Sequence, residues 1–413
     1  MLLIMRRVCA AFGVTVLALA CLAGAAEAAN YKIIAPLKGK SRPDLPCCVG
    51  YNLFGPPSIS GDFVVFTSRS GPADGIWSYQ ISTKKIRKLA GTETKIPGGK
   101  GKFTEFGFST SAFPTTVGGE TVAFYGWDKD RVFGLYTVGV RGGAVSLIAS
   151  TRTRMPGGGS RIFKDLRHAS TNGEIIAFYG LSPDNATGIF KAKVDGTGLK
   201  TVIDATDTLL DARTPNGPAD DYFGLYSQPS VGKSDVTFYA GGLFDPVSGP
   251  NAVFREKGFA DLSDNMTKLE GGGKAKHTRI FSASAAVGSS EIAIAADNPG
   301  TALYGLFKVK DLDFAAAYAT TKTKIPGGSS LFFNFLGYGL DASGLAFTAS
   351  YDQAGQLQQD VFFVDKPGGT IRRVARGADY YLPYVGDRSI SQGRIVFTEG
   401  TNFADTFFLA TPN

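Results

Sequence analysis

Hydrophobic and polar positions along this chain alternate in short apolar runs that are bounded by glycine, proline, asparagine or aspartate. One run in each copy of a repeat follows a polar turn and ends in a large apolar residue, as in VGGETVAFYG, which contains Phe124. Short runs rich in β-branched and aromatic residues predict strands. Seven such anchor residues recur 50 to 60 positions apart: Phe66, Phe124, Phe178, Phe238, Ile294, Phe347 and Phe397.

A second large apolar residue follows each anchor by 10 to 16 positions. These residues are Trp77, Tyr136, Phe190, Phe254, Phe307, Phe362 and Phe407. Each copy therefore supplies about four strands, and a unit of this size cannot bury both faces alone. Antiparallel units of this kind pack radially around a channel. The pattern predicts an all-β fold, a seven-bladed β-propeller with four antiparallel strands per blade.

The repeat also predicts how the ring closes. Residues 31–37 (YKIIAPL) resemble the fourth strand of other copies, whereas the last copy ends after three strands. We expect the N-terminal strand to complete the C-terminal blade, which would cover an edge that is otherwise open to aggregation. The expected blades span approximately residues 52–91, 103–150, 163–206, 222–270, 281–320, 332–376 and 384–413.

Residues 1–28 have the features of a secretory signal peptide: Arg6 and Arg7 at the start, an apolar stretch, and Ala-Glu-Ala at the end. We expect cleavage after Ala28, which leaves residues 29–413 as a single propeller domain in the bacterial periplasm or outside the cell, without a membrane span. The apolar stretch is also long enough to remain as an anchor. Lipidation at Cys21 is a second alternative.

Cys47 and Cys48 are adjacent and are the cysteines that remain after cleavage. In an oxidising compartment they can form a vicinal disulfide, pair with another chain, or stay as thiols in an ordinary loop. Metal binding is not expected, because two adjacent thiolates need further ligands and the chain has two histidines, His168 and His277. We interpret both histidines as satisfied polar residues, and we predict no cofactor.

The chain has 43 basic and 36 acidic residues, a mild positive excess of +7. No basic stripe with interleaved aromatic residues is present, so nucleic acid is not an expected partner. Cations gather in the blade-to-blade connections and acids in the loops between second and third strands, which share one face. These two sets can form ion pairs with each other. Alternatively, cations nearer the axis give a positive channel mouth that binds an acidic glycan or protein surface, with these candidate residues: Lys95, Arg154, Lys276 and Lys324.

Residues 57–91 resemble the repeats of TolB-type, WD40-like propellers found in bacterial envelope proteins. A Pro-Gly-Gly turn followed by phenylalanine and an N-x-x-G-x-x-A-F core resembles secreted bacterial tandem-repeat proteins whose function is unassigned. Residues 172–178 (NGEIIAF) and 341–347 (DASGLAF) match this core in part. The resemblance implies the propeller fold, and it transfers no site residue.

No nucleophile elbow, phosphate-binding glycine loop, His-x-x-x-His pair or EF-hand spacing is present in the sequence. We therefore predict no catalytic residue and favour a monomeric, non-enzymatic binding scaffold of the envelope or the medium, which recognises a partner protein or an anionic glycan on one face. The alternative is a carbohydrate-active enzyme, a glycosidase or lyase, that uses carboxylates at the channel. A structural envelope component is a third interpretation.

Overall fold

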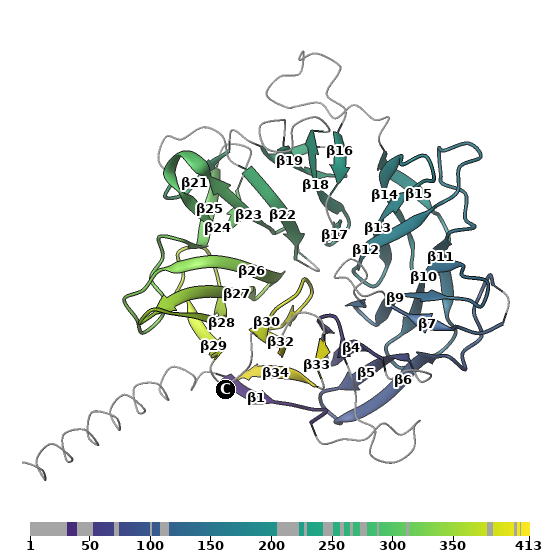
Figure 1. Ribbon diagram of the computed structural model, residues 1–413, viewed down its shortest axis with the longest axis horizontal. Coiled ribbons are helices and arrows are strands. Elements are labelled where there is room, and N and C mark those ends of the chain that lie inside the picture. Colours follow the sequence, from purple (N-terminus) through teal and green to yellow (C-terminus); the bar gives the residue numbers. More distant parts are fainter. Residues whose placement is uncertain are drawn as a thin grey trace, which may run out of the picture.

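Seven β-sheets are arranged around a central axis in the structure of the protein, a computed structural model (Figure 1). This arrangement confirms the prediction of a seven-bladed propeller. The structure describes residues 31–38, 53–69, 74–99, 101–107, 115–204, 223–226, 229–242, 251–256, 260–264, 267–272, 279–286, 289–310, 314–377, 383–399, 403–404 and 406–413. The predicted signal peptide, Cys47 and Cys48 lie outside these residues.

The strands of the first three blades follow one another along the chain from the inner to the outer edge of each blade. Blade one consists of β2 (Leu53–Phe54), β3 (Ser58–Ser60), β4 (Phe63–Ser68), β5 (Gly75–Gln80) and β6 (Lys85–Gly91). Blade two consists of β7 (Glu105–Phe106), β8 (Thr116–Gly118), β9 (Thr121–Trp127), β10 (Phe133–Gly139) and β11 (Ser146–Ser150). Blade three consists of β12 (Asp165–Thr171), β13 (Ile175–Leu181), β14 (Thr187–Lys193) and β15 (Lys200–Asp204).

The next three blades follow the same order. Blade four consists of β16 (Phe223–Tyr226), β17 (Ser230–Val231), β18 (Val236–Gly242), β19 (Asn251–Arg255) and β20 (Ala260–Asp264). Blade five consists of β22 (Arg279–Ala285), β23 (Ile292–Asn298), the 3₁₀ turn η4 (Pro299–Thr301), β24 (Leu303–Val309) and β25 (Phe314–Thr320), with β21 (Lys268–Leu269) at its outer edge. Blade six consists of β26 (Phe332–Asp341), β27 (Gly344–Gln353), β28 (Gln356–Val364) and β29 (Arg372–Ala375).

Blade seven is built from both ends of the chain. Its strands are β30 (Pro383–Tyr384), β31 (Ile390–Ser391), β32 (Arg394–Glu399), β34 (Phe407–Pro412) and β1 (Tyr31–Ile34). The strand β1 pairs antiparallel with β34, and the short strand β33 (Phe403–Ala404) pairs with β2 of blade one. The β1 pairing covers the outer edge of β34, which would otherwise carry unpaired amide groups.

The seven predicted anchors are buried, and none has more than 1% of its surface exposed. In six blades the anchor lies directly opposite the predicted second residue, for example Phe124 opposite Tyr136 and Phe178 opposite Phe190. The rings of these two pairs stack with their centroids 5.8 Å apart. Opposed aromatic pairs of this kind stabilise a sheet, and they are the unit that the sequence repeats.

Blade seven departs from this pairing by one residue. Phe397 lies opposite Phe408, whereas Phe407, the second apolar residue of this repeat, is on the other face of β34. There the ring of Phe407 contacts Phe66 and Tyr79 of blade one. Consecutive residues of a strand point to opposite faces, so the shift gives Phe407 a place between two blades.

The hydrophobic core of the described residues is divided into seven clusters, each between two neighbouring blades. The cluster between blades two and three, for example, contains Tyr125, Phe163 and Phe178. Tyr31 of β1 packs between blades six and seven, and Leu37 packs between blades seven and one. Because the apolar side chains lie between the sheets, the centre of the ring is left to polar groups.

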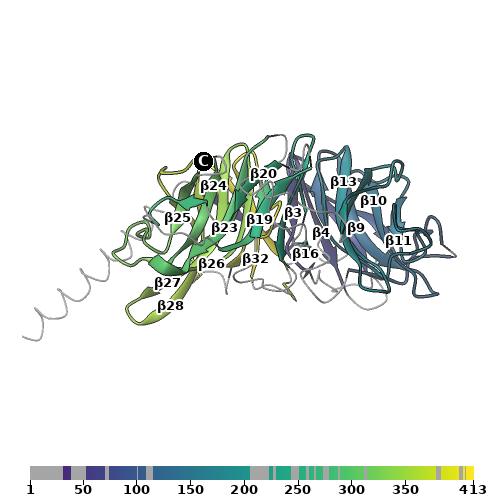
Figure 2. The same ribbon diagram turned by 90° about the horizontal axis from the view of Figure 1, so that it is seen from above.

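Blade six extends beyond the other blades on one face. Its strands β27 and β28 have 10 and 9 residues, and Figure 2 shows this hairpin projecting from one side of the disc. Leu357 near its tip is 69% exposed. The face with the hairpin is also the face of the blade-to-blade connections, since loops between second and third strands leave a blade on that side.

Candidate functional site at the centre of the ring

The guanidinium of Arg388, from the loop between β30 and β31, crosses the centre of the ring. It donates hydrogen bonds to Ser170 Oγ of β12 at 2.8 Å and to the carbonyl oxygens of Val231 and Ala285 at 2.5 and 3.2 Å. The carbonyl oxygen of Arg388 accepts a hydrogen bond from the amide of Ile59. This residue is 3% exposed. It therefore connects blade seven with the inner strands of blades one, three, four and five.

The charge of Arg388 is held next to a carboxylate. Its Nε lies 4.0 Å from Oδ2 of Asp387. Burial lowers the pKa of Arg388, and the carboxylate of Asp387 opposes this shift. A guanidinium remains protonated in proteins, so the charge is buried and needs its hydrogen bonds. The backbone of Arg388 has φ +62°, a strained conformation for a side-chain-bearing residue, and the contacts across the axis hold it there.

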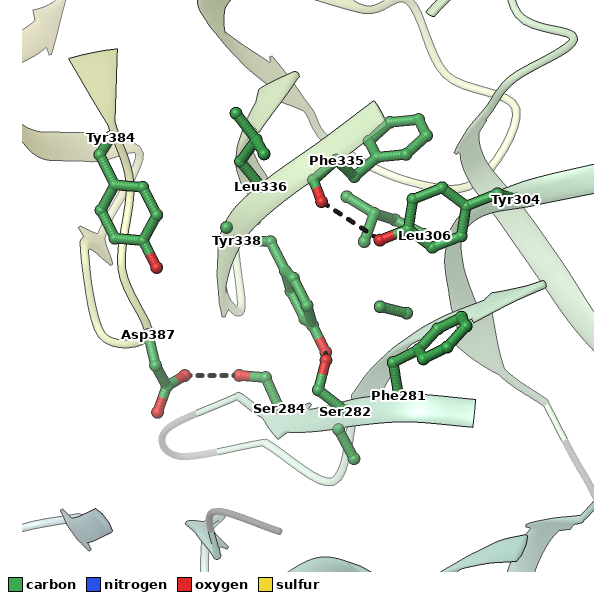
Figure 3. A pocket seen from close by; sticks show the side chains of 13 residues that line it. Phe281, Ser282, Ser284, Tyr304, Leu306, Phe335, Leu336, Tyr338, Tyr384 and Asp387 are labelled. Carbon is green, nitrogen blue, oxygen red and sulfur yellow. Dashed lines mark hydrogen bonds between the residues drawn. The ribbon is translucent and has the colours of Figure 1, made fainter. Parts of the chain in front are cut away.

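A cavity of about 250 Å³ lies beside Asp387, between blades five, six and seven (Figure 3). Five of the described lining side chains are aromatic, and Asp387 is the carboxylate among them. The lining residues come from β22 to β24, from β26 and from the β30 segment: Phe281, Ser282, Ala283, Ser284, Ala295, Tyr304, Leu306, Phe335, Leu336, Gly337, Tyr338, Tyr384 and Asp387.

Three aromatic side chains form one wall of the cavity. The ring of Tyr304 meets those of Phe281 and Phe335 edge to face, with centroids 5.8 and 5.6 Å apart. The hydroxyl of Tyr304 donates a hydrogen bond to the carbonyl oxygen of Phe335 at 3.1 Å. Phe281 is 50% exposed and Leu336 41%, so both lie at the opening. The wall is fixed by packing and continues to the surface.

Two hydrogen bonds between side chains fix the floor of the cavity. The hydroxyl groups of Tyr338 and Ser282 lie 2.9 Å apart, and Ser284 Oγ donates to Oδ1 of Asp387 at 2.7 Å, as Figure 3 shows. Burial raises the pKa of Tyr338 well above its usual range. Burial and the nearby Asp387 also raise the pKa of Tyr384. Both tyrosines are therefore neutral at physiological pH.

Gly337 allows the two tyrosine-bearing segments to approach each other. A Cβ atom at this position would lie 2.2 Å from the carbonyl oxygen of Val385 and 3.0 Å from the ring of Tyr384. Real Cβ contacts are not this short, so only glycine fits without movement of one backbone. The residue thereby sets the distance between Tyr338 on β26 and Tyr384 on β30.

His168 lies on β12, next to the contacts of Arg388. It sits at a β-bulge with φ +51°, and its Nδ1 is buried without a hydrogen-bond partner among the described residues. The pKa of His168 is lowered to about 4, mainly by burial and also by the nearby Arg167, while Asp165 opposes this shift. The ring is neutral at physiological pH. The other histidine, His277, lies outside the described residues.

Asp360 is a buried carboxylate away from the cavity. Its oxygens accept hydrogen bonds from the hydroxyl of Tyr351 at 2.6 Å and from the amide of Gly377 at 2.7 Å, and Arg373 Nε lies 2.8 Å away. Burial raises the pKa of Asp360, and these partners oppose the shift. The cluster ties three strands of blade six to the connection that follows them, so its role is structural.

The structure places three of the four predicted cationic residues at equivalent positions on different blades. Lys95, Arg154 and Lys324 are exposed, and each forms an isolated β-bridge within a blade-to-blade connection. None of the three forms an ion pair with a described residue. The fourth, Lys276, lies outside the described residues. The three connections belong to blades two, three and six, so the fold does not gather these side chains around one point.

The turns next to these cations point away from the channel. The carbonyl oxygen of Pro156 accepts a hydrogen bond from Thr201 of the outer strand β15, and that of Pro326 accepts one from Arg373 of the outer strand β29. A Cβ on Gly98 would contact Leu147 of the outer strand β11 at 2.5 Å. Each Pro-Gly-Gly turn thus rests on the outer strand of the blade that follows it.

Ion pairs link cations and acids in three blades. Arg152 lies 3.7 Å from Asp130, Arg161 lies 2.9 Å from Asp184, and Arg279 pairs with Asp297. In the first two pairs a cation of a connection meets an acid in the loop after a second strand, as the ion-pair interpretation expects. Arg279 and Asp297 instead lie opposite each other on the strands β22 and β23. Such exposed pairs contribute little stability, about 0 to 1 kcal/mol each. They do reduce the positive charge on this face.

Sequence reasoning missed Asp387, Arg388 and the cavity tyrosines. A signal was present in the last repeat, where DRSIS (387–391) stands against PPSIS (56–60) in the first. Two charged residues thus replace two prolines before an inner strand, where the core pattern needs no charge. The position after the anchor gave a second signal, because Ala295 stands where three other copies have tyrosine.

Among the described residues, no group of three or more His, Cys, Asp and Glu side chains is placed to hold a metal ion. No helix within the described part of the chain has the length and apolar character needed to cross a membrane.

Comparison with solved structures gives other propellers. An oligogalacturonate lyase in complex with manganese has 11% identity and a TM-score of 0.48, with coverage of 93% of this chain and 97% of that one. The β-propeller domain of the trilobed protease from Pyrococcus furiosus has 10% identity and a TM-score of 0.49, with coverage of 84% and 91%. An oligogalacturonate lyase from Vibrio parahaemolyticus has 10% identity and a TM-score of 0.47, with coverage of 92% and 97%. No protein-family model and no curated protein matches the chain.

Proposed function

We propose that the protein is a non-enzymatic binding scaffold that holds a small ligand, or a small group of a larger partner, in the cavity between blades five, six and seven. The observation that carries this proposal is the composition of the cavity wall, in which five aromatic rings surround a few fixed polar groups. Binding pockets in proteins are usually built in this way, mostly apolar with a small number of placed polar groups.

The polar groups favour binding over glycoside hydrolysis. Hydrolysis by the usual mechanism needs two carboxyl groups about 5 to 10 Å apart. Among the described residues that line the cavity, Asp387 is the single carboxylate, and Ser284 already donates a hydrogen bond to it. The guanidinium of Arg388 also lies close to Asp387. This arrangement suits a group that fixes the orientation of a ligand.

The proposal keeps the compartment and partners that the sequence predicts. The basic and apolar leader of residues 1–28 supports export to the periplasm or the medium. A partner protein or an anionic glycan can add contacts with the exposed cations of the blade-to-blade connections, Lys95, Arg154 and Lys324. The scaffold acts as a monomer in this proposal, since the ring of seven blades is complete within one chain.

Two leucines of blade six provide a matched test. Leu336 is 41% exposed at the cavity opening, and Leu331 is 45% exposed on the same blade without lining the cavity. A library of sugars, sugar acids and amines is screened by ligand-observed NMR against the wild type, Leu336→Trp and Leu331→Trp. We expect ligands that bind the wild type and Leu331→Trp but not Leu336→Trp, because the indole blocks the opening.

Two outcomes would contradict the proposal. Ligands that bind Leu336→Trp as well as the wild type would place the site elsewhere. Turnover of an oligosaccharide that is lost in Asp387→Asn but kept in the exposed-acid control Glu174→Gln would show that the cavity is catalytic, and the glycosidase or lyase alternative would then replace the scaffold.

A further inference from the structure

The cavity has an uneven distribution of charge. Its described lining includes the carboxylate of Asp387 and no lysine, arginine or histidine. The side chain of Asp387 is 22% exposed, whereas that of its cationic neighbour Arg388 is 3% exposed. A ligand in the cavity therefore reaches the carboxylate, while the guanidinium lies behind it with its donors directed to blades three, four and five.

Two hydroxyl groups of the cavity donate their protons to other groups of the protein. Ser284 donates its proton to Asp387, and Tyr304 donates its proton to the carbonyl oxygen of Phe335. Besides the carboxylate of Asp387, the described wall offers a ligand the faces of aromatic rings. The faces of aromatic rings carry negative electrostatic potential and attract cations.

Size and local charge narrow the ligand further. A cavity of about 250 Å³ is below the range of roughly 300 to 1,000 Å³ that holds drug-sized molecules, so it suits a head group and not an oligosaccharide. The guanidinium behind Asp387 weakens the attraction for a compact hydrated ion. A bulky cation with apolar surface also gains contacts with the rings, so it depends less on the carboxylate alone.

We infer that the cavity binds an organic ammonium group, such as an alkylated amine, with its charge near Asp387 and its apolar surface against Tyr338 and Tyr384. This inference rests on the proposed ligand-binding role of the cavity and names its ligand class. The ammonium group can belong to a free small molecule or to a larger partner. In either case the recognised group is cationic, in contrast to the acidic ligand that the exposed lysines and arginines would attract.

The test compares choline with its uncharged analogue, in which carbon replaces the ammonium nitrogen, by titration calorimetry on the mature chain. The two probes have the same shape, so the difference in affinity measures the charge. We expect choline to bind about tenfold more tightly, in line with a desolvated cation–π contact. Asp387→Asn and Tyr384→Leu should each remove most of this difference, whereas Glu174→Gln, which removes an exposed acid on blade three, should leave it unchanged.

A second variant guards against a folding effect, because Asp387 also neighbours the buried Arg388. Tyr384→Phe keeps the ring and should keep the preference for choline, whereas Tyr384→Leu should lose it. Equal affinity for the two probes, or a preference that survives both Asp387→Asn and Tyr384→Leu, would overturn the inference. Binding of a neutral sugar or a sugar acid that Leu336→Trp blocks, without binding of choline, would overturn the ligand class and leave the scaffold in place. If Leu336→Trp affects no probe of any class, the scaffold proposal and the inference both fail.

Discussion

Blades two to four and blade five are built from the same repeat but differ at the residue after the anchor. Blades two, three and four have tyrosine there: Tyr125, Tyr179 and Tyr239. Blade five has Ala295, which lines the cavity, and the remaining blades have threonine. The hydroxyl of Tyr125 accepts a hydrogen bond from the amide of Ala169 in the next blade, so this tyrosine fills the space between two blades. The cavity lies where that side chain is missing.

The alanine in blade five indicates how a regular ring can gain a cavity. No residue of the extended β27–β28 hairpin of blade six is among the described residues that line the cavity. The cavity follows from a smaller residue at one repeated position, together with Gly337, which lets the neighbouring tyrosines approach. In a propeller whose core lies between the blades, the loss of one large side chain opens space next to the axis, where polar groups already lie.

Arg388 belongs to both sides of the comparison, because it spans from blade seven to blades three, four and five. Arg388→Ala removes three donated hydrogen bonds and the guanidinium that lies beside Asp387. Loss of one member of a buried charged pair costs about 3 to 5 kcal/mol. Urea denaturation measures the loss in the free energy of unfolding. The partly exposed Arg394→Ala serves as the control, with an expected change within about 0.5 kcal/mol, and similar values for both variants would refute a central role for Arg388.

Tyr125→Ala should open a cavity on the regular side that resembles the one beside Ala295. The tyrosine is 1% exposed, and truncation of a buried aromatic residue costs about 3 to 5 kcal/mol. Tyr125→Phe removes only the hydroxyl and its hydrogen bond to Ala169, at a cost of about 1 kcal/mol. Denaturant titration measures the loss in the free energy of unfolding relative to the wild type. This loss should be several-fold larger for Tyr125→Ala than for Tyr125→Phe. Equal losses would mean that the ring does not fill the space between the blades.

Ala295→Tyr is the converse change. Three other blades hold tyrosine at this position, so the variant should fold with a small loss of stability. The new ring should occupy the part of the cavity that Tyr338 and Leu306 line. Ligand binding in the cavity should fall by at least about tenfold, measured with the best ligand from the screen. Ala295→Ser is the control that keeps the space open. Full binding by Ala295→Tyr would show that the missing tyrosine is not what forms the site.

Most of the fold was predictable from the sequence, because it depends on local repeats. The anchors and the second apolar residues recur in order along the chain. In six blades the two residues lie opposite each other on neighbouring strands. Arg388 was not predictable, since its partners Ser170, Val231 and Ala285 lie 103 to 218 positions away and share no pattern with it. The cavity was hidden for the same reason: it results from one alanine, one glycine and tyrosines on three blades, which come together only when the ring closes.

The bulge at His168 lies in blade three, on the regular side, and it predicts a pH dependence. Its folded pKa of about 4 lies below the model-peptide value of 6.5. The unfolded chain therefore takes up a proton first as the pH falls, so stability present above pH 6.5 is lost between pH 6.5 and 4. The loss is at most about 3.5 kcal/mol, at roughly 1.4 kcal/mol per pKa unit.

Denaturation of wild type and His168→Asn across this pH range measures the effect. Asparagine tolerates positive φ, so it keeps the bulge without the titrating ring. We expect a flatter pH profile in the variant, and NMR titration of the imidazole should give the depressed pKa directly. A normal pKa for His168, or identical pH profiles, would mean that solvent reaches the ring.

The smallest expected effect concerns the exposed cations of the connections. Lys95 and Arg154 have no ion-pair partner among the described residues, whereas Arg152 and Arg161 pair with Asp130 and Asp184. The double variants Lys95→Ala/Arg154→Ala and Arg152→Ala/Arg161→Ala remove the same charge. If these unpaired cations attract an acidic glycan, the first variant should weaken binding at low ionic strength more than the second, by about twofold to threefold, because Arg152 and Arg161 are already compensated by carboxylates.

Titration of a sulfated or carboxylated glycan at two salt concentrations measures this difference, which should vanish at the higher salt. Both variants should keep wild-type stability within about 0.5 kcal/mol, since exposed charges contribute little. Equal losses in the two variants would mean that only the net charge of the face matters. In that case the cations of the connections form no local site, and recognition would depend on the cavity alone.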